Sequence, residues 1–140
     1  MRTVVIYESL TGTTREAAEV IGEELRADGV DVVVCPIDGI DLAALAAADL
    51  VIVGSWVDGF VFLGQRPGRA GRLRNMPVID GKKAAVFCTY AVDPGKTLTK
   101  LSQIVTDRGG DVVGGLAIRR TEVEEGAREF VDRVLGTVDA

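Results

Sequence analysis

A turn rich in hydroxyl groups, Ser9-Leu10-Thr11-Gly12-Thr13-Thr14, stands between an apolar run and a segment with helical spacing. The first N–H groups of a helix have no intrahelical partner and lie at the positive end of its dipole. Four hydroxyls beside such a helix start can hold a phosphate dianion without a lysine, and glycine lets the backbone curl under the anion. An ordinary helix cap would need only two hydroxyls. The turn therefore predicts a phosphate site.

Two aromatic residues follow other apolar runs, where strands are expected to end. Trp56 is the only tryptophan and comes one residue after the third run, and Tyr90 follows the fourth. A tryptophan at a loop rim can stack on a flat ring, and Tyr90 could flank the same ring from its other side. The alternative for Trp56 is that it seals the end of the sheet against solvent.

The elements that must position these residues alternate along the chain. Most of the apolar runs are unbroken, which indicates strands covered on both faces. Segments with helical spacing follow them, beginning near Thr13, Asp41, Ala70, Thr97 and Thr121. The alternation predicts an α/β fold, a three-layer doubly wound five-stranded parallel sheet, for which we take the order 2-1-3-4-5. Strands are predicted at Thr3–Tyr7, Asp31–Cys35, Leu50–Ser55, Lys83–Thr89 and Asp111–Ile118.

Such a sheet binds ligands at the carboxyl ends of its strands, where the strand order reverses. In the predicted order this reversal lies between the first and third strands. The turn at residues 9–14 is then expected to face the loop that begins Gly54-Ser55-Trp56. The connection from Trp56 to Gly81 is long and rich in glycine and proline, which is typical of a functional segment.

Length and composition limit the possible classes of protein. The 140 residues fit one domain, 1–140, and 47% apolar with 26% charged residues is typical of a globular chain. No segment approaches the ~18 to 20 continuous apolar residues of a membrane helix, so we expect no membrane partner. The start, Met1-Arg2-Thr3-Val4, leads directly into a strand without an export leader, and a cytoplasmic location is expected.

The side chains available for chemistry are few. There is no histidine, which excludes Ser-His and Cys-His nucleophile pairs and the commonest general base. Cys35 and Cys88 are isolated and end apolar runs, so they are interpreted as small buried core residues. Any redox or transfer chemistry is therefore expected to belong to a cofactor.

The net charge of −5 argues against nonspecific nucleic-acid binding. The charge is unevenly distributed, because residues 64–83 carry six basic side chains against one acidic one. Arginine suits phosphate through its bidentate geometry, so this segment is a candidate site for an anionic substrate or partner. A solvated surface or a subunit contact is the alternative. The arginines concerned are Arg66, Arg69, Arg72 and Arg74.

Taken together, these features resemble the short-chain flavodoxins over essentially the whole chain. The family's S-x-T-G-x-T turn is matched in full by Ser9, Thr11, Gly12 and Thr14. The resemblance implies FMN as cofactor, with its phosphate in the turn and its ring against Trp56 and the loop after the fourth strand. It also implies that Asp58-Gly59 is the nearest candidate for a peptide that reorients beside the flavin. The expected cofactor-binding residues are Ser9, Leu10, Thr11, Gly12, Thr13, Thr14, Ser55, Trp56, Asp58, Gly59, Thr89 and Tyr90.

The chain departs from the family's pattern in two loops. The loop after the fourth strand is short and lacks the customary acidic residues around its aromatic, here Tyr90. A basic, aromatic stretch at 60–69 replaces the acidic one that usually lies beside the flavin. This replacement predicts a higher potential for the reduced flavin and a different redox partner.

Three functions are compatible with these observations. The first is an FMN-binding redox protein that carries electrons between partner proteins. The second is an FMN-dependent NAD(P)H or quinone-type reductase, in which the arginines receive the second substrate. The third is a similar scaffold that has lost flavin. The segment Pro94-Gly95-Lys96-Thr97 only partly matches an ATP-binding loop, because Tyr90 replaces its first glycine, and it is interpreted as a turn and helix cap.

Overall fold

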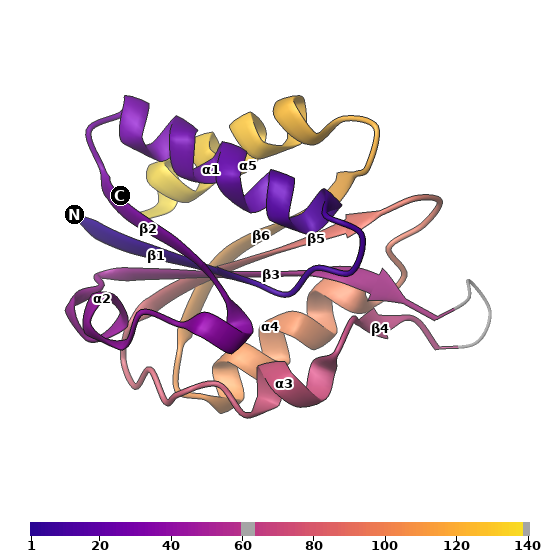
Figure 1. Cartoon of the computed structure of the whole chain (residues 1–140), viewed down its shortest axis with the longest axis horizontal. Coiled ribbons are helices and arrows are strands. Elements are labelled where there is room, and N and C mark those ends of the chain that lie inside the picture. Colours follow the sequence, from indigo (N-terminus) through magenta and orange to yellow (C-terminus); the bar gives the residue numbers. More distant parts are fainter. Residues whose placement is uncertain (60–63, 139–140) are drawn as a thin grey trace.

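Within residues 1–59 and 64–138, the part of the chain that this computed structural model describes, five parallel strands form the central sheet (Figure 1). Their order is β2-β1-β3-β5-β6. This order confirms the predicted α/β fold and the arrangement 2-1-3-4-5, because β5 and β6 are the fourth and fifth strands of the prediction. The strands are β1 (Arg2–Tyr7), β2 (Asp31–Pro36), β3 (Leu50–Asp58), β5 (Lys83–Tyr90) and β6 (Asp111–Arg119).

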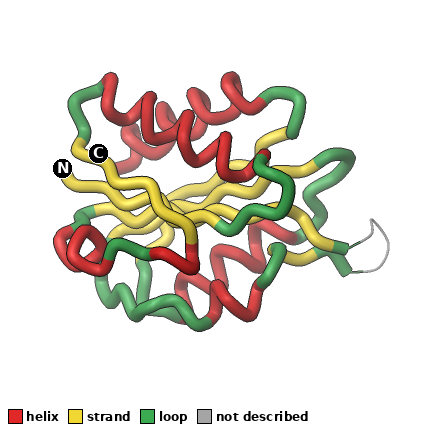
Figure 2. The backbone as a smooth tube through the Cα atoms, viewed as in Figure 1, coloured by secondary structure: helices red, strands yellow, loops and turns green. Residues whose placement is uncertain are grey.

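Helices cover both faces of the sheet, which gives three layers (Figures 1 and 2). The helices α1 (Thr13–Ala27) and α5 (Val123–Val138) pack side by side on one face. The opposite face carries α2 (Leu42–Ala47), α3 (Ala70–Arg74) and α4 (Thr97–Asp107), with a short 3-10 helix at Ile37–Gly39. No helix in the described ranges combines the length and apolar character that a bilayer crossing requires.

Side chains along each strand alternate between two apolar cores. On β1, Val4 and Ile6 join the core beneath α2, α3 and α4, whereas Val5 joins the core beneath α1 and α5. Both faces of the strand are therefore buried. This double burial explains why the strands read as unbroken apolar runs and not as alternating ones.

The structure adds one strand that the sequence did not predict. The two-residue β4 (Arg66–Pro67) pairs antiparallel with the end of β3, joining Asp58 to Arg66 and Val57 to Pro67. This pairing extends β3 to Asp58, past the predicted end at Ser55. Trp56 consequently lies within the strand and not in the loop after it. The residues between the two strands include 60–63, which lie outside the described residues.

Cys35 and Cys88 are buried in the core as unpaired cysteines, which confirms the interpretation from the sequence. Burial raises the pKa of the Cys88 thiol to about 12 and also raises the pKa of Cys35. Because the thiolate is the reactive form, neither cysteine is a nucleophile near neutral pH. Both act as small packing residues.

We predict that Phe130→Ala will lower the free energy of unfolding by about 3 to 5 kcal/mol, because it opens a cavity between α5 and the sheet. The Phe130 and Phe87 rings meet edge to face, with centroids 5.8 Å apart. Urea unfolding followed by circular dichroism measures the loss. The exposed Val78→Ala is the control and should stay within about 0.5 kcal/mol of the unchanged protein. A loss below about 1 kcal/mol for Phe130→Ala would contradict the role assigned to this contact.

Candidate functional site

The candidate site lies where the carboxyl ends of β1, β3 and β5 meet at one edge of the sheet. The strand order reverses between β1 and β3, which is where doubly wound sheets hold their ligands. A cavity of about 420 Å³, its open mouth included, is found at this edge. Seven of the predicted cofactor-binding residues contribute to its wall. The lining is Leu10, Thr11, Thr13, Thr14, Trp56, Val57, Thr89, Tyr90, Ala91 and Arg120.

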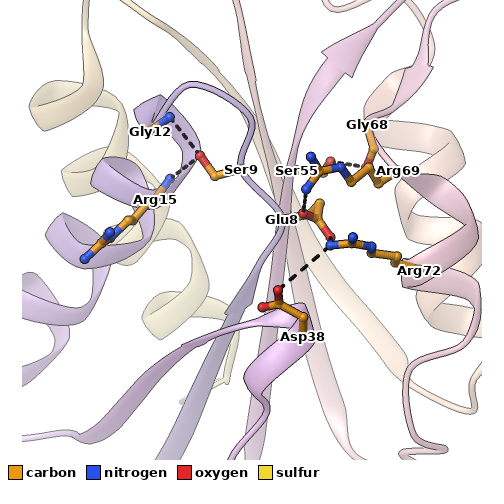
Figure 3. A network of polar contacts seen from close by, with 9 residues as sticks. All are labelled: Glu8, Ser9, Gly12, Arg15, Asp38, Ser55, Gly68, Arg69 and Arg72. Atoms are coloured by element: carbon orange, nitrogen blue, oxygen red, sulfur yellow. Dashed lines mark hydrogen bonds and ion pairs between the residues drawn. The ribbon is translucent and has the colours of Figure 1, made fainter.

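The turn before α1 is closed by its own serine (Figure 3). Ser9 Oγ accepts hydrogen bonds from the amides of Gly12 and Arg15, at 3.1 and 3.3 Å. Gly12 takes the left-handed conformation with φ of 99°, where a side chain would be strained. Ser9 and Gly12 thus shape the turn and are not part of the cavity wall.

The first amides of α1 provide the donors that an anion would need. Within the described part of the chain, the structure gives no protein acceptor to the amides of Thr13 and Thr14. These amides begin the helix, so no carbonyl precedes them at the right spacing. The hydroxyl-bearing side chains of Thr11 and Thr13 line the cavity beside them. The turn can therefore bind an anion with backbone and hydroxyl donors together.

A buried hydrogen bond joins this turn to the central sheet. Thr14 Oγ1 and Thr89 Oγ1 are 2.7 Å apart, and each residue is 2% exposed. Thr14 lies in the first turn of α1 and Thr89 near the end of β5, and the two residues are 75 positions apart in the chain. The bond fixes the first turn of α1 against the strand that also carries Tyr90.

Arg120 is a site residue that the sequence analysis missed. Its Nη2 lies 3.4 Å from Thr11 Oγ1 and 3.3 Å from Thr13 Oγ1, and its amide donates to the carbonyl of Tyr90 at 2.9 Å. It follows β6, the last strand, and adds a positive charge to a turn that has none of its own. The only signal in the sequence was its position just after a predicted strand.

Trp56 is held between the cavity and the β4–α3 segment. Its ring lies directly against Gly68, where an added Cβ would come within 2.1 Å of the indole. Ser55 Oγ donates to the carbonyl of Gly68 at 2.8 Å, and the Gly68 amide donates to the carbonyl of Trp56 at 2.9 Å. Ser55 is fully buried and lies outside the cavity wall, so its observed contact holds Gly68 beneath the ring.

Tyr90 also lines the cavity and lies at the end of β5, the strand that pairs with β3. The Arg119 guanidinium lies 5.2 Å from the centre of its ring, and Arg119 Nη1 donates to the carbonyl of Ala91 at 3.4 Å. A cation over the ring face is a favourable contact for an aromatic side chain. Tyr90 is half-buried and lines the cavity, so part of its surface is available to a ligand.

Two predicted site residues lie outside the cavity wall, at the tip of β3. Asp58 faces Arg66 on β4, with their charged groups 3.5 Å apart. Gly59 has φ of 99°, and a Cβ there would lie 3.1 Å from the carbonyl oxygen of Gly64. The left-handed backbone is compatible with the peptide role expected for this glycine, which stays a prediction.

Most of the basic side chains in residues 64–83 contact a carboxylate or a carbonyl of the protein itself. Arg69 and Arg72 both contact Glu8, and Arg66 contacts Asp58. The two lysines are used as well, because Lys82 Nζ donates to the carbonyls that end α2 and Lys83 contacts Asp111. Among the described residues, no ion pair involves Arg74. An anionic substrate would have to compete with these internal partners.

The family model described as "Flavodoxin domain" matches residues 4–116. The chain belongs to the flavodoxin domain family. It is 25% identical over 128 residues to the flavodoxin of Clostridium beijerinckii, which spans 91% of this chain and 93% of that protein. Oxidised flavodoxin 2 from Bacillus cereus is similar in structure, with a TM-score of 0.75 and 26% identity over 97% of this chain and 99% of that one. A mutant flavodoxin from Pseudomonas aeruginosa shares the fold over 100% of both chains, at a TM-score of 0.75 and 17% identity.

Proteins of the flavodoxin family bind FMN and pass electrons to redox partners. Membership and these relatives support an FMN-binding electron carrier, and they do not favour the reductase or the scaffold without flavin. The cavity of this chain fits such a group. The helix amides and hydroxyls in its wall suit a phosphate, and the two aromatic side chains suit a flat ring.

We predict that Thr14→Val and Thr89→Val will each lower the free energy of unfolding by about 1 to 3 kcal/mol, because each leaves the other hydroxyl buried without a partner. The double variant should lose less than the sum, since both polar groups are then gone. Urea unfolding of the four proteins measures the coupling. Thr137→Val, on the exposed face of α5, is the control for the substitution itself. Additive losses would show that the 2.7 Å contact does not couple the two residues.

Proposed function

We propose that this protein holds FMN in the cavity at the ends of β1, β3 and β5 and carries electrons between partner proteins. The observation that carries the proposal is that one cavity is lined by the donors of the turn, which we take as its anion-binding end, and by two aromatic side chains, which we take as its aromatic end. FMN bound there would supply one- and two-electron chemistry, which the side chains of this chain do not provide. The chain's own residues bind the group, orient it and limit its contact with water.

At the anion-binding end, we assign the FMN phosphate to the turn at residues 9–14. The amides of Thr13 and Thr14 and the hydroxyls of Thr11 and Thr13 are its expected donors. Arg120 is the proposed cation, because its guanidinium already contacts both hydroxyls. Ser9 and Gly12 keep the turn in shape without touching the phosphate.

At the aromatic end, we assign the flavin ring to the space between Trp56 and Tyr90. Both side chains line the cavity, and each has a guanidinium against part of its surface, from Arg69 and Arg119 respectively. Stacking on such rings buries apolar area and excludes water from the flavin. Thr89 lies on the same strand as Tyr90 and supports this end through its bond to Thr14.

The proposed partners are redox proteins that meet the basic face formed by residues 64–74 through acidic groups. Charge complementarity of this kind steers encounter and orientation. The pairing of Arg66, Arg69 and Arg72 with internal carboxylates leaves these side chains about half exposed, so they can contact a protein surface without leaving the fold. The same pairing weakens the case for NADPH as a second substrate. The cytoplasm is the proposed compartment, as the sequence predicts.

We predict that the apoprotein will bind FMN tightly and riboflavin much more weakly, because riboflavin lacks the phosphate that the turn would hold. Titration followed by flavin fluorescence and by Trp56 fluorescence measures both affinities. Trp56 emission should fall as FMN binds, since it is the only tryptophan and lies in the cavity wall. Equal affinities would remove the phosphate assignment, and no binding of FMN would remove the electron-carrier proposal.

We predict that Arg120→Ala will weaken FMN binding by about 10-fold, or about 1.4 kcal/mol, through loss of one charge-assisted contact to the phosphate. Riboflavin affinity should stay unchanged, because the ring end is intact. Arg133→Ala is the matched control, since Arg133 is an exposed arginine on α5 whose guanidinium pairs with Glu129 on the same helix. An Arg120 variant with unaltered FMN affinity would show that the guanidinium does not reach the phosphate.

A further inference from the structure

Glu8 is a buried carboxylate directly before the phosphate turn (Figure 3). It is 4% exposed, and its amide donates to the carbonyl of Gly54 on β3 at 2.9 Å. One carboxylate oxygen accepts a hydrogen bond from Arg69 Nη1 at 2.7 Å, and the other lies 3.6 Å from Arg72 Nη1. A carboxylate this deeply buried needs such partners, because desolvation otherwise disfavours its charge.

Arg69 connects this carboxylate to the Trp56 ring. Its guanidinium carbon lies 5.7 Å from the centre of the indole, and its other contact is the 2.7 Å bond to Glu8. Arg69 also has a left-handed backbone, with φ of 49° and ψ of 47°, which is unusual for a residue other than glycine. Such a conformation persists only where its surroundings determine it, and here they include Gly68 beneath the ring.

We propose that Glu8 and Arg69 are positioning residues that fix the plane of the Trp56 ring. This inference rests on the proposed FMN site, for which Trp56 forms one wall. Glu8 is anchored by its burial and by its amide bond to β3, so it holds Arg69 in one place, and Arg69 lies over the indole ring. The ion pair spans 61 positions of the chain and ties the phosphate turn to the ring wall.

The two partners of the ion pair differ in their exposure to solvent, and this difference decides which of them is substituted. Arg69 is 41% exposed in its side chain, so water can solvate it when the carboxylate is removed. Glu8 cannot be solvated in the same way, so removing Arg69 would leave a buried charge with Arg72 alone. Glu8→Gln therefore removes the charge that holds Arg69 and leaves only a neutral acceptor, while keeping the size of the side chain at position 8.

We predict that Glu8→Gln will increase acrylamide quenching of Trp56 fluorescence in the apoprotein about 2-fold, because the Arg69 guanidinium is no longer held over the ring. FMN and riboflavin affinities should fall by the same factor, about 5-fold, since the ring wall changes and the phosphate turn does not. Asp38→Asn is the matched control: it makes the same chemical change in an exposed carboxylate that contacts Arg72 and not Arg69. It should leave quenching and both affinities unchanged.

The double variant Glu8→Gln/Arg69→Asn guards against misfolding as an explanation. It removes the charge and its partner together, and asparagine tolerates the left-handed backbone. It should show the same increase in quenching as Glu8→Gln. Quenching equal to that of the unchanged protein in both variants would overturn the inference, as would a loss of FMN affinity without a loss of riboflavin affinity. Quenching is measured on the apoprotein and does not depend on FMN. If the unchanged protein failed to bind FMN, the proposed function would be wrong, and the quenching experiment would still test the role of Glu8.

Discussion

The parallel pairing of β1 with β3 is the interaction on which the site depends. It places Tyr7 beside Gly54, so that the turn after β1 and the aromatic end of β3 begin at the same edge of the sheet. The amide of Glu8 continues the pairing one step beyond β1. Because the register of a buried strand is fixed by which side chains enter each core, packing far below the cavity sets the spacing between the phosphate turn and Trp56.

The features of the site that depend on a few consecutive residues could be predicted from the sequence. The hydroxyl-rich turn, the unbroken strands and the placement of Trp56 and Tyr90 near strand ends each have a local pattern, because dihedral preferences and burial act over a few positions. The strand order needed more than these patterns, because short right-handed connections allow more than one doubly wound order; 2-1-3-4-5 is the order of the family that the chain resembles.

The contacts that could not be predicted join positions far apart in the chain. The charge of Arg120 is visible in the sequence, but its reach back to Thr11 spans 109 positions and depends on how β6 and α5 are packed. The short β4 has no pattern of its own, since two residues containing a proline do not resemble a strand. Likewise, the run of arginines gave no sign that Glu8 and Asp58 would neutralise part of it.

The two hydrogen bonds that Ser9 accepts affect the entropy cost of binding a ligand at the turn. Its hydroxyl accepts from the amides of Gly12 and Arg15, so bonds within the chain hold the turn at two points. The conformational entropy that these two bonds remove is lost when the protein folds and not when a ligand arrives. The amides of Gly12 and Arg15 are taken up by the chain itself, and those of Thr13 and Thr14 stay available as backbone donors at the start of α1.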